Sequence, residues 1–452
     1  MKTTHFARPP RLVPPTAVLA GLLSCWTLTP LAVADTSLEP RVAVATYQGT
    51  GGMLLTRANE RRAWDAAAVG DAVLSRDELL ALPGTRARIE SAGKGATLTL
   101  AGNLPELSTF PGLESTVVLH DSRVFDFDLT LVHGRILLKN TRKEGAAKVW
   151  LRLPNEAWQL TLPQPGDEVA MEMYGRWPRG VAFSKKPKPG DVPTQVVALL
   201  VTAGRVELKI GDMQQGLSAP PGSAYFYWDS VAGSDEGPQR RDALPPWAGP
   251  KADTLPGAKA VAEVANRYLA RLKERTPAAA LVQLLADANA EKDKERAALT
   301  REFAITGLAA LGDLGPVADA LADSKHLDAR ETAVVALRNW IGAQPDRDPR
   351  LYRVLTDVQG YTAGEAATVM ELLHSPFVVE QPETYETLIE YLNHKRLAVR
   401  ELARWHLYHL APVGRNIKYE AAATPEERAK AAKEWKDLIP TGQLPPKEKK
   451  KG

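Results

Sequence analysis

The chain has 452 residues, with 57 Lys and Arg against 54 Asp and Glu, and 44% of its residues are hydrophobic. This length predicts two or three domains, each large enough to bury a core. Lys2, Arg8 and Arg11 lie in the first 34 residues, which hold no acidic residue, so the remaining chain is neutral. Neutrality argues against a nucleic-acid partner, because non-specific binding needs a basic face.

Residues 1–34 have the pattern of a secretory signal peptide. A positive start is followed by a mostly apolar run, and Ala32-Val33-Ala34 before Asp35 provides a small-x-small cleavage site. The apolar run is too short and interrupted for a comfortable membrane span, which needs about 20 residues. The sequence therefore predicts an exported protein, in the periplasm or at the cell surface.

Cys25 is the only cysteine of the chain, and Leu22-Leu23-Ser24-Cys25 is similar to a lipobox. Lipidation of Cys25 is therefore an alternative to cleavage after Ala34, and an uncleaved anchor is a third alternative. We expect membrane contact only in the lipidated form. After cleavage at Ala34 the chain would have no cysteine, which excludes disulfides and thiolate chemistry.

Residues 46–230 have the texture of a β domain, in which short apolar or alternating runs are separated by Gly, Pro, Asn and Asp. From Phe125 to Leu131 apolar residues alternate with Asp126, Asp128 and Thr130, which predicts a strand with one buried face. Residues 149–153 and 158–162 follow the same rule. The continuous apolar run 196–201 predicts a strand that is covered on both faces.

Gly134-Arg135-Ile136-Leu137-Leu138-Lys139 is echoed by Gly204-Arg205-Val206-Glu207-Leu208-Lys209, which predicts two turn-to-strand units. With 51–57, Trp64, 69–74, 87–90, 96–100 and 219–222, these stretches resemble the FecR-like domain. The resemblance implies a periplasmic or surface β domain. Some FecR-like proteins signal to a sigma factor, but that role needs a cytoplasmic segment and a transmembrane helix, where this chain has a signal sequence.

Residues 231–256 are rich in proline and show no hydrophobic periodicity. This composition predicts a stiff, extended linker. We therefore expect the regions on its two sides to fold independently and to engage separate partners.

Residues 257–440 become alanine-rich and helical in period. Glu302, Glu331, Glu365 and Glu401 recur at intervals of 29 to 36 residues, each followed by an Ala one or two positions later. An Arg precedes three of them, whereas Gly364 stands in the third unit. The pattern predicts four helix pairs, with first helices over 277–286, 316–321, 349–358 and 383–392.

This repeat resembles HEAT repeats, which implies a solenoid of stacked helix pairs. Alanine would allow close helix approach, and the Arg-Glu pairs would lie exposed at the helix starts. Thr424 and Pro425 predict a last helix, with Ala429, Ala432 and Trp435 packed on the stack. We expect the lysine-rich tail, 441–452, to be disordered.

Three groups of residues have the composition of a chemical site. His406 and His409 are three positions apart on a helix, which suits two metal ligands, but no third ligand is near. His120-Asp121-Ser122 holds the residue types of a catalytic triad, yet adjacent residues cannot converge in triad geometry. Asp121, Asp126 and Asp128 could together bind Ca²⁺, or the strand aspartates could simply form the solvent-exposed face of their strand. We expect no metal, no cofactor and no catalytic residue.

Five tryptophans fall in the β region, and aromatic side chains either pack in cores or bind sugars. Tyr225, Tyr227 and Trp228 form the candidate binding surface. The sequence thus predicts a multidomain protein, an all-β FecR-like domain followed by an all-α HEAT-like solenoid. We expect a non-enzymatic scaffold or sensory protein of the bacterial cell envelope that binds another protein. The alternative is a protein that binds carbohydrate or peptidoglycan of the cell wall.

Overall fold

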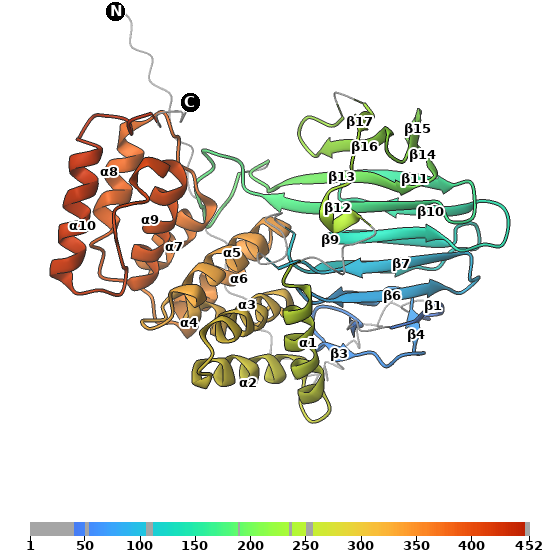
Figure 1. The fold of residues 1–452 in the computed structure, drawn as a ribbon, viewed down its shortest axis with the longest axis horizontal. Helices are drawn as coiled ribbons and strands as arrows, with labels where there is room; N and C mark the ends of the chain where they lie inside the picture. Colours follow the sequence, from blue (N-terminus) through green and yellow to red (C-terminus); the bar gives the residue numbers. More distant parts are fainter. Residues whose placement is uncertain are drawn as a thin grey trace, which may run out of the picture. The chain divides into compact units, whose positions relative to one another are not determined.

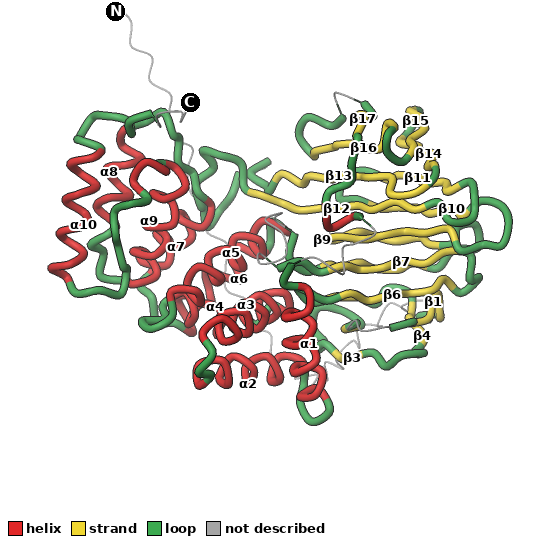
Figure 2. The backbone as a smooth tube through the Cα atoms, viewed as in Figure 1, coloured by secondary structure: helices red, strands yellow, loops and turns green. Residues whose placement is uncertain are grey.

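The computed structural model describes residues 40–49, 54–104, 112–188, 190–234, 237–249 and 256–447. A β-sheet region is followed by a helical region, as Figure 2 shows by colour. The predicted signal peptide, with Cys25 and the Ala34 cleavage site, lies outside the described residues. Within the described part of the chain, no helix is long and apolar enough to cross a membrane.

Strand pairing divides the β region into two sheets that share one long strand, β9 (Figure 1). Sheet I runs in the order β4 (Ala72–Leu74), β1 (Ala43–Tyr47), β6 (Arg86–Ser91), β7 (Ala96–Ala101), β9 (Phe127–Asn140), β12 (Glu168–Arg176), β13 (Thr194–Ala203), β16 (Gly222–Asp229) and β17 (Gln239–Arg241). Sheet II runs in the order β3 (Asp65–Ala66), β2 (Leu55–Arg57), β5 (Glu78–Ala81), β8 (Ser115–His120), β9, β10 (Ala147–Arg152), β11 (Ala157–Leu162), β14 (Arg205–Ile210) and β15 (Met213–Ser218). The β9–β10 pair is parallel and the other pairs are antiparallel.

Strand β9 passes from one sheet to the other at Gly134. Its first half pairs with β8 and β10 in sheet II, and its second half pairs with β7 and β12 in sheet I. Gly134 has φ of +94°, and a Cβ there would lie 2.0 Å from the Glu114 carbonyl oxygen. Only glycine fits that bend without strain. The two strands expected at 125–131 and 134–139 are therefore one strand, whereas the Gly204 unit does follow a turn and begin a separate strand, β14.

The alternation predicted the buried faces correctly. Val149 and Leu151 of β10 join one apolar core with residues of sheet I such as Met171 and Phe226. Trp158 of β11 lies in this core, edge-to-face with Phe226 at 5.6 Å between ring centroids. Burial of this apolar surface between the sheets is the main favourable contribution to stability of the β region.

Sheet I is covered on its second face as well. In β13, Val197, Leu199 and Val201 face sheet II, and Leu200 packs against Trp247 and Ala248. The predicted covering of both faces at 196–201 is thus confirmed. Trp247 and Ala248 belong to the segment expected to be an extended linker, where Pro246–Ala248 forms a short 3₁₀ turn and Gln239–Arg241 forms β17. This part of the segment is packed on the sheet because its tryptophan finds an apolar surface there.

The helical region contains ten α-helices. They are α1 (Ala258–Leu272), α2 (Pro277–Ala290), α3 (Lys294–Leu311), α4 (Leu314–Leu321), α5 (Leu327–Ala343), α6 (Arg347–Arg353), α7 (Ala363–His374), α8 (Pro382–Tyr391), α9 (Leu397–Leu410) and α10 (Pro425–Leu438). A π-helical turn, Val354–Val358, extends α6. The four expected first helices correspond to α2, α4, α6 with its extension, and α8. The four recurring glutamates, each with the Arg or Gly before it, lie in α3, α5, α7 and α9.

The expected last helix is α10. Thr424 caps it, and Glu427 completes the capping box by accepting a hydrogen bond from the Thr424 backbone. Ala432 and Trp435 are buried as expected, but Ala431 rather than Ala429 is the third buried residue. Of the tail, residues 441–447 are described, and the Gly442 N–H donates to Glu386.

Helices α5 and α9 also contact each other directly, although α7 lies between them in the repeat order. In a linear solenoid each repeat contacts only its neighbours. The ten-helix region therefore has the predicted helices without showing the predicted solenoid.

The helical region packs against sheet I through α5 and β12. Gly175 and Gly342 meet there so closely that a Cβ on Gly175 would lie 1.8 Å from the Gly342 carbonyl oxygen. Beside them, the Asn339 amide donates to Glu114 at 2.9 Å, and its carbonyl oxygen accepts from His133 at 3.1 Å. The two regions thus share a contact of backbone and buried polar groups, and Leu55, Leu80 and Leu82 of the β region also join the apolar core of the helices. Their independent folding stays a prediction.

Candidate functional site

The predicted surface of Tyr225, Tyr227 and Trp228 is divided by the pleat of β16. Trp228 points into the core and is 5% exposed, edge-to-face with Trp158 at 6.2 Å. Tyr225 and Tyr227 lie on the opposite face, where the Arg241 guanidinium lies 4.3 Å above the Tyr225 ring. Partial burial raises the pKa of Tyr225. The three rings do not form one platform, and ligand binding by the two tyrosines stays a prediction.

The residues of the triad and calcium hypotheses do gather in space. His120, Asp121, Ser122, Asp126 and Asp128 line one hollow of about 270 Å³ at the end of β8 and the start of β9. Four of these residues, all except Asp121, form hydrogen bonds within the β region. Ser122 Oγ accepts backbone hydrogen bonds from Val124 and Phe125, and His120 Nε2 is bonded to Thr130 Oγ1 at 2.8 Å. Burial lowers the pKa of His120.

The two strand aspartates are occupied by arginines. Asp126 accepts from Arg142 at 2.6 Å, and Asp128 accepts two bonds from Arg152, both at 2.8 Å. A guanidinium fork matches a carboxylate in this way and competes with a cation for the same oxygens. Among the described residues, no group of three or more His, Cys, Asp or Glu is placed to hold a metal ion.

His406 and His409 have separate structural roles. His406 is 1% exposed and donates from Nε2 to the Leu372 carbonyl at 2.6 Å. Burial, together with the charge of Arg338, lowers its pKa to about 3. His409 instead stacks on Trp405, with 4.0 Å between ring centroids. Each imidazole thus has one ring nitrogen bonded to a backbone carbonyl, that of Leu372 for His406 and that of Trp405 for His409.

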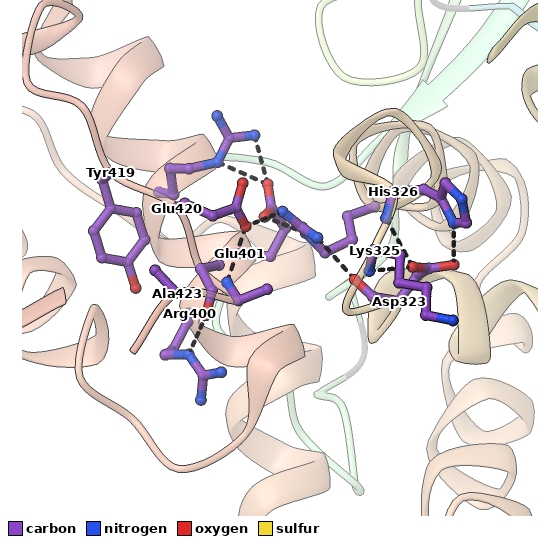
Figure 3. A network of polar contacts seen from close by, with 12 residues as sticks. Asp323, Lys325, His326, Arg400, Glu401, Tyr419, Glu420 and Ala423 are labelled. Atoms are coloured by element: carbon purple, nitrogen blue, oxygen red, sulfur yellow. Dashed lines mark hydrogen bonds and ion pairs between the residues drawn. The ribbon is translucent and has the colours of Figure 1, made fainter. Parts of the chain in front are cut away.

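Sequence reasoning missed a network of buried charges in the helical region (Figure 3). Arg330 of α5 is 1% exposed, and Glu401 of α9 is fully buried. Arg330 donates to Glu401 at 2.8 Å and to Glu420, and Arg404 donates to the other Glu401 oxygen at 2.8 Å. Neighbouring carboxylates raise the pKa of Arg404 despite its burial. The expectation that the Arg-Glu pairs lie exposed at helix starts is therefore wrong for the three arginines and for Glu401, whereas Glu331 is exposed.

The repeated arginines share one role. Arg301 donates to the Ala288 carbonyl at 3.2 Å, Arg330 to Asp323 at 2.8 Å, and Arg400 to His394 at 2.8 Å. Each of these carbonyls lies at or just beyond the end of the preceding first helix, where carbonyls lack helical partners and the dipole favours a cation. The repeat of an Arg before each second helix was a signal for this cap.

In the third unit, the carbonyl beyond the first helix is capped by an arginine from a different place in the sequence. Gly364 replaces the arginine there, and Arg396, just before α9, donates to the Gly360 carbonyl at 3.2 Å. Arg396 also donates to Glu365 at 2.8 Å, and with Lys395 it lowers the pKa of that carboxyl. The departure in the sequence is thus compensated from the next helix pair. Each of these charges has a partner within the chain, so the network acts as a structural element.

A groove remains on the surface of the helical region. It has a volume of about 800 Å³ and is lined mainly by α1 and α3, with contributions from the start of α5 and from the α2–α3 connection. Six carboxylates face it against two guanidinium groups, those of Arg267 and Arg296. The acidic residues are Glu263, Glu291, Asp293, Glu295, Glu302 and Asp328.

Part of this charge is already paired. Arg296 bonds Glu291 at 2.9 Å, and Asp328 accepts from Arg301 at 2.7 Å. Among the lining residues and Arg301, the carboxylates outnumber the guanidinium groups by three. Glu263 and Glu295 are exposed at its edge. The groove therefore favours a positively charged occupant.

Comparison of the chain with protein families, with curated proteins and with solved structures finds no match. The resemblances to the FecR-like domain and to HEAT repeats therefore remain resemblances. The observed architecture is a two-layered β region followed by a ten-helix region.

Proposed function

We propose that this chain is an exported, non-enzymatic protein-binding scaffold of the bacterial cell envelope. Its acidic groove over α1 and α3 would bind a basic segment of a partner protein. The groove is the observation that carries the proposal, because its volume suits a peptide segment and its excess of carboxylates selects for Lys and Arg. The signal-peptide pattern of residues 1–34 supports export.

The finer description of the fold belongs to the same proposal. We take the β region to be FecR-like and the helical region to be a variant of HEAT repeats. The sequence stretches quoted above support the first part, and the four helix pairs with their shared arginine caps support the second. Direct contact of α5 with α9 would make this variant more closed than a linear stack.

Site-specific photocrosslinking in intact cells tests the groove. A benzophenone amino acid at exposed Glu295 should capture a protein partner, whereas the same probe at exposed Lys433 of α10 should not. Equal capture at both positions, or none at Glu295, would contradict the proposal.

Charge reversal provides the matched control. The double variant E263K/E295K should lose most of the crosslinked partner, because it removes the excess charge at the groove edge. E426K/E434K makes the same change of net charge on exposed sites of α10 and should retain it. Capture should also fall with rising salt, since exposed charges are screened within about 8 Å at physiological ionic strength.

A further inference from the structure

The outer face of sheet II carries a row of aligned side chains across five strands. Register places Asp128 of β9 beside Trp150 of β10, Trp150 beside Gln159 of β11, and Gln159 beside Lys209 of β14. Gln214 of β15 is the next residue in line. Strands lie about 4.8 Å apart, so the row extends over roughly 19 Å.

Trp150 is a large aromatic residue on a polar surface. Its neighbours in sequence, Val149 and Leu151, point into the core between the sheets, and the pleat turns Trp150 to the opposite side. The residues around it are polar: Lys148, Thr161 and Glu207 on one side of the row, and Thr130 and Arg152 on the other. The half-buried Phe125 lies against its ring, at 5.5 Å between centroids.

A hollow of about 610 Å³ opens beside the tryptophan. Its lining combines the Trp150 ring with two amides, a carboxylate and an ammonium group, those of Asn155, Gln159, Glu156 and Lys209. These groups offer both hydrogen-bond donors and acceptors around one aromatic face. The arrangement is distinct from the β16 tyrosines, which lie on sheet I.

We propose that this face of sheet II binds a neutral oligosaccharide, with one sugar ring on Trp150 and its neighbours along the row. The negative face of an aromatic ring attracts the slightly positive C–H groups of a pyranose ring. The flanking amides and charged groups suit hydroxyls, which both donate and accept. Opposite charges are balanced on the face, which favours a neutral ligand.

A protein partner fits this surface less well than a saccharide. Protein hot spots cluster aromatic residues in desolvated pockets, whereas here Trp150 and Phe125 lie among exposed polar side chains. The proposal is independent of the acidic groove, because that groove lies on the helical region.

Calorimetric titration of the full mature chain with cellohexaose and chitohexaose tests the proposal. At least one of these probes should bind. W150A should weaken binding by about tenfold or more, equivalent to about 1.4 kcal/mol, and W150F should fall between. K433A, at an exposed site of α10, should bind like the parent, and Y227A tests the candidate surface on sheet I. If W150A does not fold, Q159A/K209A replaces it, because both side chains point outward.

Three results would overturn the proposal. They are no binding of either probe at millimolar concentration, unchanged binding by W150A, or a loss of binding confined to Y227A. The last result would place the sugar site at the β16 tyrosines.

Discussion

The β region and the helical region place their buried charges differently. The space between the two sheets is filled by apolar residues such as Trp158 and Phe226, and charged residues of sheet II remain on its outer face. The helical region buries Arg330 and Glu401 completely among its apolar residues. The β region also buries one ion pair, Arg135 with Glu172 at 2.8 Å, but on the face of sheet I that points away from sheet II. Residue type alone therefore does not predict exposure.

The buried charges give the largest expected effect. R330M should lower the free energy of unfolding by about 3 kcal/mol, because it leaves Glu401 with Arg404 alone and removes the cap on the Asp323 carbonyl. Denaturant unfolding measures this change. R275M removes an exposed arginine and should change stability by less than about 0.5 kcal/mol.

The double variant R330M/E401Q sharpens this test. If Arg330 and Glu401 are coupled as the geometry indicates, the stability loss of the double variant should be smaller than the sum of the losses of R330M and E401Q. Additive losses, or a loss for R330M no larger than for R275M, would show that the network does not stabilise the helical joint.

The contact between the regions gives the next effect. G175A should cost about 1–3 kcal/mol or more, because its Cβ would meet the Gly342 carbonyl oxygen at 1.8 Å and backbone cannot move aside cheaply. G216A on β15 adds the same methyl group where nothing lies within 4 Å, so it should be nearly neutral. Thermal unfolding of both variants measures the difference.

The same variants test whether the halves fold independently. Limited proteolysis should cut first between residues 232 and 256 in the parent if the segment acts as a linker, and faster in G175A. Initial cutting inside either region would count against the division.

The local periodicity of the sequence predicted the helices and strands, but it did not predict contacts between segments that are distant in the sequence. Alternation placed Val149 and Leu151 inside, and the Arg-Glu repeat located the second helices, because both depend on neighbours in sequence. Burial of Arg330 depends on Glu401, 71 positions away. The crossing of β9 between sheets depends on how close Gly134 comes to Glu114. Contacts of this kind produce no periodic signal in the sequence.

The candidate sites show the same limit. Aromatic content singled out β16, but the pleat alone would have shown that Tyr227 and Trp228 point to opposite faces. The Trp150 row needs the register of β10, β11 and β14, which join segments up to about 60 residues apart. The groove needs the packing of α1 against α3, which no motif encodes.

Acid should weaken the helical region through His406. Its pKa is near 3 in the fold and about 6.5 when unfolded. The unfolded chain therefore binds a proton that the folded chain does not, so this contribution is complete above pH 6.5 and is lost as the pH falls toward 3. The loss is at most about 1.4 kcal/mol per pH unit. H406Q keeps a donor for the Leu372 carbonyl and should flatten unfolding free energy against pH; an unchanged slope would assign the acid sensitivity elsewhere.

The open face of sheet II gives the smallest effect on stability. W150T should change the unfolding free energy by no more than about 0.5 kcal/mol, because Trp150 lies on the outer face and threonine suits a strand. Denaturant unfolding of W150T beside R330M checks the contrast between the two regions directly. A loss of several kcal/mol would mean that Trp150 and Phe125 form a second core, and it would remove the reason to regard this ring as kept for a ligand. A neutral result, with binding lost in W150A, would separate the residues that hold this fold together from those that recognise a partner.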